Sequence, residues 1–437
     1  MTEIVREPLS IREIHLNRAG SYLRWGAIAN VILAALIVIA GIIGGLGAHD
    51  LFQVVADIAL GRYGGSADTA LIVVVLVAQA NLSALLVIMV GMLAQEFWAP
   101  LVVWLLVAVN GYLLVHYGFT PALITILAAG MAGIIAIRDL GAFRINPLML
   151  KELRERMRGA RAFVVLTVYL ALMSGFAVLI FLIESNTGSD TSVTGSLGRN
   201  VFRGIVGLEL LLIVFIAPAF TAGAISNERE RKTYDLLQIT LLPKPSFVIG
   251  KLESALGYIL LLLLAAIPLQ SMAFFFGGVT QDELLLAFII LGVTGITLGT
   301  VGMYFSTTVD RTLTASVRAY TVAFAVTIGV PLGLGFFISV LNEIFVVDNL
   351  SVSPVLQSVL IYADSIVTSL NPVTAAIESQ NLLVSNQGVA FYTERLRDGT
   401  TIPLISPWIP LTIIYLTSAA VMVVLSVRAM RRSDEVD

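Results

Sequence analysis

The sequence lacks cysteine entirely and contains little charge and little histidine. Without cysteine, the chain has no disulfide framework, no thiolate metal site and no cysteine nucleophile. The three histidines, His15, His49 and His116, stand singly in the sequence and suggest no metal cluster. Charged residues make up 13% of the 437 residues, against about 25% in an average soluble domain. This composition excludes an ordinary soluble protein.

Apolar residues are abundant and are arranged in long runs. Hydrophobic residues make up 58% of the chain, and the mean hydropathy is +0.94. A membrane-spanning helix needs about 20 mostly apolar residues, because lipid offers no water to unpaired backbone groups. The runs predict an all-α, polytopic membrane protein with about ten spans, four followed by six. These spans lie near residues 26–47, 69–94, 98–117, 120–137, 162–183, 204–225, 254–276, 284–306, 319–341 and 408–427.

The distribution of basic residues predicts the orientation of the spans. Lys and Arg are retained on the cytoplasmic side of a membrane. If the N-terminus is inside, 21 of the 26 basic residues fall in inside segments and five in outside segments. We therefore expect both termini to be cytoplasmic. The net charge of −3 gives no indication of a nucleic-acid partner, and none is expected.

A basic stretch at residues 138–161 divides the chain into two parts. Residues 1–140 are expected to form a four-helix membrane region, whose role the sequence does not indicate. Residues 141–437 are expected to form a six-helix domain with a long outer loop at 342–407. Both parts are expected to lie in the lipid bilayer.

The outer segments differ in composition. Segment 184–200 is rich in Gly, Ser and Thr and is expected to be a mobile loop. Segment 350–385 carries apolar residues, with a helical pattern over 373–383, and is expected to fold back onto the membrane face. Carboxylates of the outer loop have irregular spacing, which makes them weak candidates for an acid–base pair. They are Glu343, Asp348, Asp364 and Glu378.

The cytoplasmic segment 226–251 is the most informative in the chain. Its pattern predicts a helix over 227–242, about 22 Å long, capped by Asn227 together with Glu230 and ended by Pro243. Opposite charges four residues apart and an apolar stripe support this helix. The charge pairs are Glu228 with Lys232 and Arg231 with Asp235, and the stripe is Tyr234, Leu237 and Leu241. An interfacial connector lying in the headgroups would have the same spacing.

The same segment resembles the cytoplasmic loop of type 2 ABC exporter permeases. The shared features are a Glu-x-Glu pair, a following Thr, a Leu-Leu pair, and a Gly-Lys at the start of the next span. Here they are Glu228, Glu230, Thr233, Leu236, Leu237, Gly250 and Lys251. The resemblance implies a coupling helix that docks on an ATP-binding subunit, with Asp235 a further coupling residue and Leu236 and Leu237 its packing contacts. Lys232 departs from the pattern, because the family usually has glycine there.

Two further segments extend the resemblance to about residues 143–432. Segment 146–158 resembles the entry to the family's first span, with Asn146 as a helix cap and Pro147 at the first helical position. It predicts an amphipathic helix on an anionic leaflet, although a charge cluster that only fixes topology is the alternative. Residues 305–306 and 311–320 resemble the family's second cytoplasmic turn. The first four spans lie outside the resemblance.

The chain has no phosphate-binding loop of its own. Gly250-Lys251-Leu252 lacks both the upstream glycine and the hydroxyl residue of the Gly-x-x-x-x-Gly-Lys-[Ser/Thr] motif. The protein is therefore not expected to be an enzyme by itself or to bind a cofactor or metal directly. ATP and Mg²⁺ would be bound by a separate ATPase subunit.

The resemblance implies that the chain is the permease subunit of an ATP-driven ABC transporter in a bacterial inner membrane. The resemblance implies an exporter, with an ABC ATPase subunit and a second permease copy or paralogue as partners. The alternative is a polytopic membrane enzyme or assembly scaffold that uses the outer loop 342–407, with 227–242 as an inert connector.

Ionisable side chains are rare within the predicted spans, and each is a candidate for function. Glu209 is the clearest case. Because it lies only about five residues inside the outer end of its span, the alternative is that it reaches the surface or pairs with Arg203. Uncharged polar residues are expected to bond to one another across helices. They are Gln79, Asn81, Asn110 and Gln270.

Overall fold

The computed structural model describes residues 11–45, 67–187, 194–234, 243–344, 354–385, 390–396, 399 and 401–433. The chain forms two compact units. Unit 1 comprises residues 1–148, 241–250 and 423–437, and unit 2 comprises residues 149–240 and 251–422. Three helices contribute residues to both units: α6 (Pro147–Met157), α11 (Lys244–Phe276) and α17 (Trp408–Ser433).

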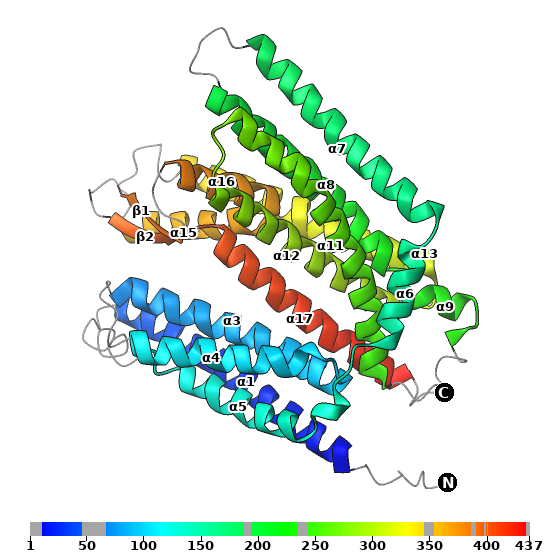
Figure 1. Cartoon of the computed structure of the whole chain (residues 1–437). Helices are drawn as coiled ribbons and strands as arrows, with labels where there is room; N and C mark the ends of the chain where they lie inside the picture. Colours follow the sequence, from blue (N-terminus) through cyan, green and yellow to red (C-terminus); the bar gives the residue numbers. More distant parts are fainter. Residues whose placement is uncertain are drawn as a thin grey trace. The chain divides into compact units, whose positions relative to one another are not determined.

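The other helices of unit 1 form a bundle (Figure 1, blue to cyan). They are α1 (Ile11–Gly45), α3 (Ala67–Ala94), α4 (Trp98–Tyr117) and α5 (Ala122–Arg138), followed by a 3₁₀ turn at Leu140–Ala142. α1 packs against α3 and α5, and Gly26 permits the close approach to α5, because a Cβ there would lie 2.4 Å from the Cβ of Ala128. Asn81 of α3 and Asn110 of α4 exchange two side-chain hydrogen bonds of 2.9 Å, as predicted for these two residues, whereas Gln270 donates to the carboxyl of Glu209 instead.

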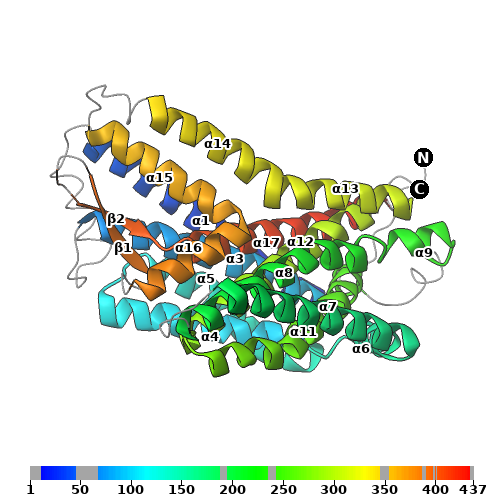
Figure 2. The same ribbon diagram turned by 90° about the horizontal axis from the view of Figure 1, so that it is seen from above.

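Unit 2 is built around α12 (Gln281–Thr308), which has buried side chains along most of its length. Its other helices are α7 (Ala160–Thr187), α8 (Thr194–Thr221), α9 (Ser226–Glu230), α13 (Thr312–Phe324), α14 (Val330–Asn342), α15 (Pro354–Leu370) and α16 (Pro372–Val384), with a π-helical turn at Ala325–Gly329. α8, α13 and α16 pack against α12, and α14 and α15 run side by side (Figure 2). Gly302 of α12 meets α8 directly, because a Cβ there would lie 2.0 Å from the hydroxyl oxygen of Thr221.

All ten predicted spans fall on helices. Among the described residues, nine helical segments are long and apolar enough to cross a membrane, which confirms the all-α, polytopic class. One of these, Thr312–Leu341, contains α13, the π-helical turn and α14. The tenth predicted span is α5, whose 17 residues extend about 25 Å.

The outer segment 184–200 is more regular than predicted. α7 continues to Thr187 and α8 begins at Thr194, so the prediction of a loop over the whole segment is wrong. Residues 188–193 lie outside the described residues. An established helix gains one hydrogen bond for each residue that it adds, and it therefore extends through polar residues at its end.

The outer loop 342–407 contains helices and a hairpin. The predicted helical pattern at 373–383 is confirmed by α16, which meets α15 at an angle of 116°. The side chain of Asn371 caps α16 by accepting a hydrogen bond of 2.8 Å from the backbone N–H of Val373. Strands β1 (Phe391–Arg395) and β2 (Thr401–Ile405) pair as an antiparallel hairpin, which the sequence analysis did not predict.

Candidate functional site

The helix predicted over 227–242 is broken in the structure, by a turn at residues 231–233. α9 spans only Ser226–Glu230 and begins before Asn227, so Asn227 is not its cap. Instead, the backbone N–H groups of Ile225 and Ser226 donate to the hydroxyl oxygen of Ser306, at 2.8 and 3.1 Å. A side chain of α12 therefore satisfies amides at the start of α9, which a local sequence pattern could not indicate.

The backbone itself ends α9. Lys232 has a φ of +54°, in the left-handed region that disfavours residues with a Cβ. The resemblance placed glycine at this position, and glycine adopts such a φ without steric cost. The predicted pair of Glu228 with Lys232 is replaced by a pair of Glu228 with Lys251. Asp235, Leu236, Leu237 and Leu241 lie outside the described residues.

Lys251 of α11 is the centre of a charged cluster in unit 2. Its ammonium nitrogen lies 2.6 Å from Glu228 Oε1 of α9 and 2.8 Å from Glu152 Oε1 of α6. The Lys251 side chain is only 2% exposed, so little water screens these pairs. One buried cation therefore holds α9, α6 and α11 together.

Arg156 adds a second cation beside this cluster. Its guanidinium lies 3.9 Å from Glu152 Oε2, donates to the backbone oxygen of Phe220 at 3.4 Å, and lies over the Phe220 ring at 5.7 Å. Burial lowers the pKa of Arg156 from its ordinary value, while the Glu152 charge opposes this shift. The arrangement ties α6 to the end of α8.

The other charged residues of α9 reach the turn between α12 and α13. Arg229 lies 3.2 Å from Asp310 and also stacks over the ring of Tyr234 at 5.1 Å. Glu230 accepts hydrogen bonds from the hydroxyl and the backbone N–H of Thr312, at 2.6 and 3.4 Å. Contacts of exposed charged groups are weakened by competition from water, so these two position α9 more than they stabilise it.

Three segments that lie far apart in the sequence thus meet at α9. They are α6, the start of α11 with Lys251, and the region from Ser306 to Thr312, and they correspond to the segments that carried the family resemblance. Of the predicted site residues, Glu228 and Glu230 have different partners, and the hydroxyl of Thr233 donates to the backbone oxygen of Glu228 at 3.3 Å. We call the charged and polar groups around α9 the α9 cluster: Glu152, Arg156, Glu228, Arg229, Glu230, Lys251, Ser306, Asp310 and Thr312.

The sequence analysis did not assign Lys251 or Glu152 to the site. Lys251 belonged to the Gly-Lys feature of the resemblance, but nothing in its spacing showed that it would pair with residues 23 and 99 positions away. A lysine followed by a long apolar helix was the one sequence feature that could have indicated a buried ion pair.

Glu209 lies apart from the α9 cluster, in the middle of α8. It is fully buried and accepts hydrogen bonds from the hydroxyl of Tyr169, at 3.0 Å, and from the amide of Gln270. The suggested pairing with Arg203 is wrong, because Arg203 bonds to Gln380 and Asn381 at 2.9 and 2.6 Å. Buried polar partners on α7 and α11 satisfy the carboxyl, so it has no need to reach the surface.

The outer loop forms an open cavity of about 760 Å³. Asp364 of α15, Glu378 of α16 and Glu394 of β1 line it, so two of the four carboxylates considered from the sequence do come together. Glu343 is not among the residues that line it, and Asp348 lies outside the described residues. In the described part of the chain, no three His, Asp or Glu residues are grouped as a metal site would require.

Comparison with protein families gives one finding. A family model described as ABC-2 family transporter protein matches residues 184–428, which is more than half of the chain. The match contains α9, Lys251 and the α12–α13 turn, whereas the first four spans and α6 lie outside it. No curated protein matches the chain.

Proposed function

Because the chain belongs to the ABC-2 family of transporter proteins, we propose that it is the permease of an ATP-driven exporter and that α9 is its coupling element. A separate ABC ATPase would bind and hydrolyse the ATP, with Mg²⁺, on the cytoplasmic side. The permease would act with a second copy or a paralogue, in a bacterial inner membrane. The chain's own part is the transmembrane path and the surface that receives the ATPase.

The α9 cluster is the observation that supports this proposal. Glu228 connects α9 to α6 and α11 through Lys251, while Arg229 and Glu230 connect it to the turn between α12 and α13. A partner that displaces α9 would therefore move several membrane helices together. Charged and hydrogen-bonded contacts of defined geometry transmit such a displacement better than apolar contacts, because they lose energy steeply when their atoms separate.

Coupling requires that the ATPase bind two permease conformations with different affinity. The exposed carboxylate of Glu230, together with Thr233, Asp235, Leu236 and Leu237, would contact the ATPase. Glu228 would act inside the permease, since its carboxyl is already bonded to Lys251. The roles of the two glutamates in the Glu-x-Glu pair are therefore different.

The test uses the tagged full-length protein, purified in mild detergent from its native membrane together with its partners. We compare Glu230→Gln and Glu228→Gln with Glu155→Gln, an exposed glutamate of α6 outside the α9 cluster. We expect an ABC ATPase to co-purify with the wild type and with Glu155→Gln. Glu230→Gln should reduce its recovery, whereas Glu228→Gln should retain the ATPase but abolish the effect of the permease on its rate of ATP hydrolysis.

Two results would overturn the proposal. One is that no ABC ATPase is recovered in any of several mild detergents. The other is that both variants retain the ATPase and its regulation as the Glu155→Gln control does. Loss of biological function on substituting Asp364 or Glu378 in the outer cavity, with no ATPase recovered, would instead favour a membrane enzyme that uses that cavity.

A further inference from the structure

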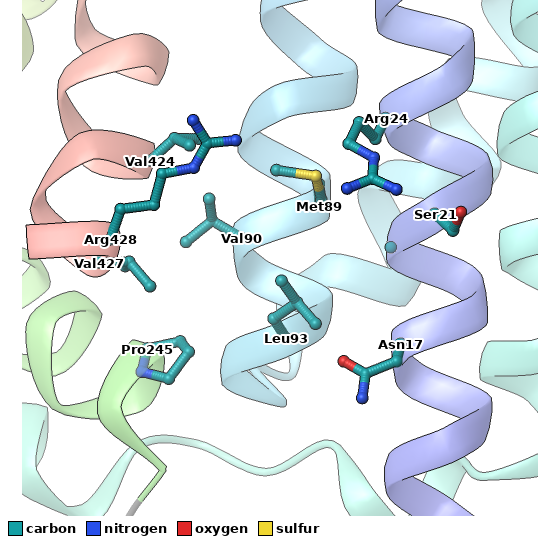
Figure 3. A pocket seen from close by; sticks show the side chains of 11 residues that line it. Asn17, Ser21, Arg24, Met89, Val90, Leu93, Pro245, Val424, Val427 and Arg428 are labelled. Carbon is teal, nitrogen blue, oxygen red and sulfur yellow. The ribbon is translucent and has the colours of Figure 1, made fainter. Parts of the chain in front are cut away.

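Unit 1 contains a pocket of about 330 Å³ that the transport proposal does not use. It is lined by α1, α3, the end of α17 and Pro245 at the start of α11 (Figure 3). Two of its lining residues are arginines, Arg24 of α1 and Arg428 of α17. None of the described residues that line it is acidic.

The chemistry of the walls is divided between cations and apolar side chains. Figure 3 shows Arg24 and Arg428 on α1 and α17, on either side of α3. α3 supplies the wall between them with apolar side chains, Met89, Val90 and Leu93, and α17 adds two valines. Asn17 and Ser21 add hydrogen-bonding groups along the α1 side. The pocket therefore offers hydrogen-bond donors and positive charge beside an apolar wall.

Each helix presents one face to the pocket. The α1 residues Asn17, Ser21 and Arg24 follow the helical period, as do Val424 and Arg428 on α17. Neither arginine has an ion pair or hydrogen bond with another described residue. Two guanidinium groups beside one cavity repel each other unless an anion lies between them.

The pocket lies toward one end of three candidate membrane spans. The apolar span of α1 begins at Ile14, shortly before Asn17, and that of α3 ends at Ala94, next to Leu93. The span of α17 ends just beyond Arg428. All three helices therefore bring the same end of their spans to the pocket. By the distribution of basic residues this end is cytoplasmic, where anionic phospholipids attract basic pockets between helices.

We propose that this pocket binds the phosphate headgroup of an anionic phospholipid, held by Arg24 and Arg428. A planar guanidinium donates two parallel hydrogen bonds to phosphate oxygens, and two such groups match a phosphodiester from both sides. The apolar wall of α3 would contact the glycerol and the first acyl carbons. A free phosphate ion would satisfy the arginines but would gain nothing from that wall.

The experiment measures binding of dioleoyl phosphatidylglycerol to the purified full-length protein in neutral detergent, by native mass spectrometry, with dioleoyl phosphatidylcholine as the zwitterionic probe. We expect phosphatidylglycerol to bind at least about tenfold more tightly, since it lacks the choline cation that two arginines would repel. The variant Arg24→Gln/Arg428→Gln should lose about tenfold in affinity for phosphatidylglycerol and little for phosphatidylcholine.

The control variant is Arg18→Gln/Arg138→Gln, which removes two exposed arginines of unit 1 that do not line the pocket. It should change the affinity by less than about twofold, because the long-range attraction of exposed charges is screened by salt. An equal loss in the control would overturn the proposal, since the binding would then depend on overall charge. Equal affinity of the wild type for both lipids would overturn it as well.

Two further arms complete the test. Ser21→Leu narrows the pocket without changing its charge and should weaken phosphatidylglycerol binding, so it serves even if the arginine variant does not fold. Unchanged binding in this variant would contradict a site in the pocket. Sodium phosphate at millimolar concentration should not displace the lipid, and displacement would assign the site to free phosphate instead. None of these outcomes depends on the ATPase.

Discussion

Unit 2 buries two carboxylates in opposite ways. Glu228 of the α9 cluster shares the ammonium of Lys251 with Glu152, so a positive charge lies 2.6 Å from its oxygen. Glu209 is buried in α8 and meets only neutral donors, Tyr169 and Gln270. A carboxylate that is paired with a cation depends on that cation, whereas a carboxyl among neutral donors can be replaced by a neutral group of the same shape. The two sites should therefore respond differently to the same kind of substitution.

The largest expected effect comes from removing the shared cation. Lys251→Met leaves Glu228 without its counter-ion and Glu152 with Arg156 alone, at 3.9 Å, and breaking a buried pair in this way costs about 3–5 kcal/mol. We expect a large fall in the midpoint of thermal unfolding of the purified protein, measured in detergent by its loss of monodispersity. A loss of less than about 1 kcal/mol in the free energy of unfolding, the size expected of an exposed pair, would contradict the central role of Lys251.

A double variant separates the stability of this cluster from its function. Glu228→Gln/Lys251→Met removes both charges of the 2.6 Å pair and leaves Glu152 with Arg156, and replacing a whole buried ion pair by neutral groups of similar volume is often neutral for stability. It should recover most of the stability lost in Lys251→Met. It should not recover ATPase regulation, because the connection between α9 and α6 is still absent. Recovery of both properties would mean that the charges serve stability alone.

The sequence predicts the helices of the protein better than it predicts the partners of its buried charged residues. The spans and α6 with its Asn146 cap follow from local rules, since lipid requires the backbone groups of each span to be satisfied within it and the cap bonds to a residue only two positions away. The partners of Glu228 and Glu209 do not, because they come from other helices. The break after Glu230 was also missed, since a helical pattern alone does not reveal a left-handed residue such as Lys232.

The third prediction concerns Glu209, and its expected effect on stability is smaller. Glu209→Gln keeps an acceptor for Tyr169, and a rotation of the Gln270 amide would present its oxygen, which has no partner in the structure, to the new NH₂ group. We expect a loss of at most about 1 kcal/mol, against about 1–3 kcal/mol for Glu209→Leu, which leaves buried donors unsatisfied. Equal, large losses in both variants, measured by the same unfolding assay, would show that the negative charge itself is needed.

The smallest expected effect is a gain in stability from a substitution at the end of α9. There the stability depends on the backbone conformation and not on a charge. Lys232 has a φ of +54°, while its neighbour Arg231 has a φ of −84°. Lys232→Gly removes strain of about 1–2 kcal/mol, offset by about 0.5–1 kcal/mol from the greater freedom of glycine in the unfolded chain, so we expect a net gain near 0.5 kcal/mol. Arg231→Gly relieves no strain and should be destabilising. If both variants lower the unfolding midpoint equally, the left-handed residue does not strain the chain, and the end of α9 must be fixed by its bonds to Asp310 and Thr312 instead.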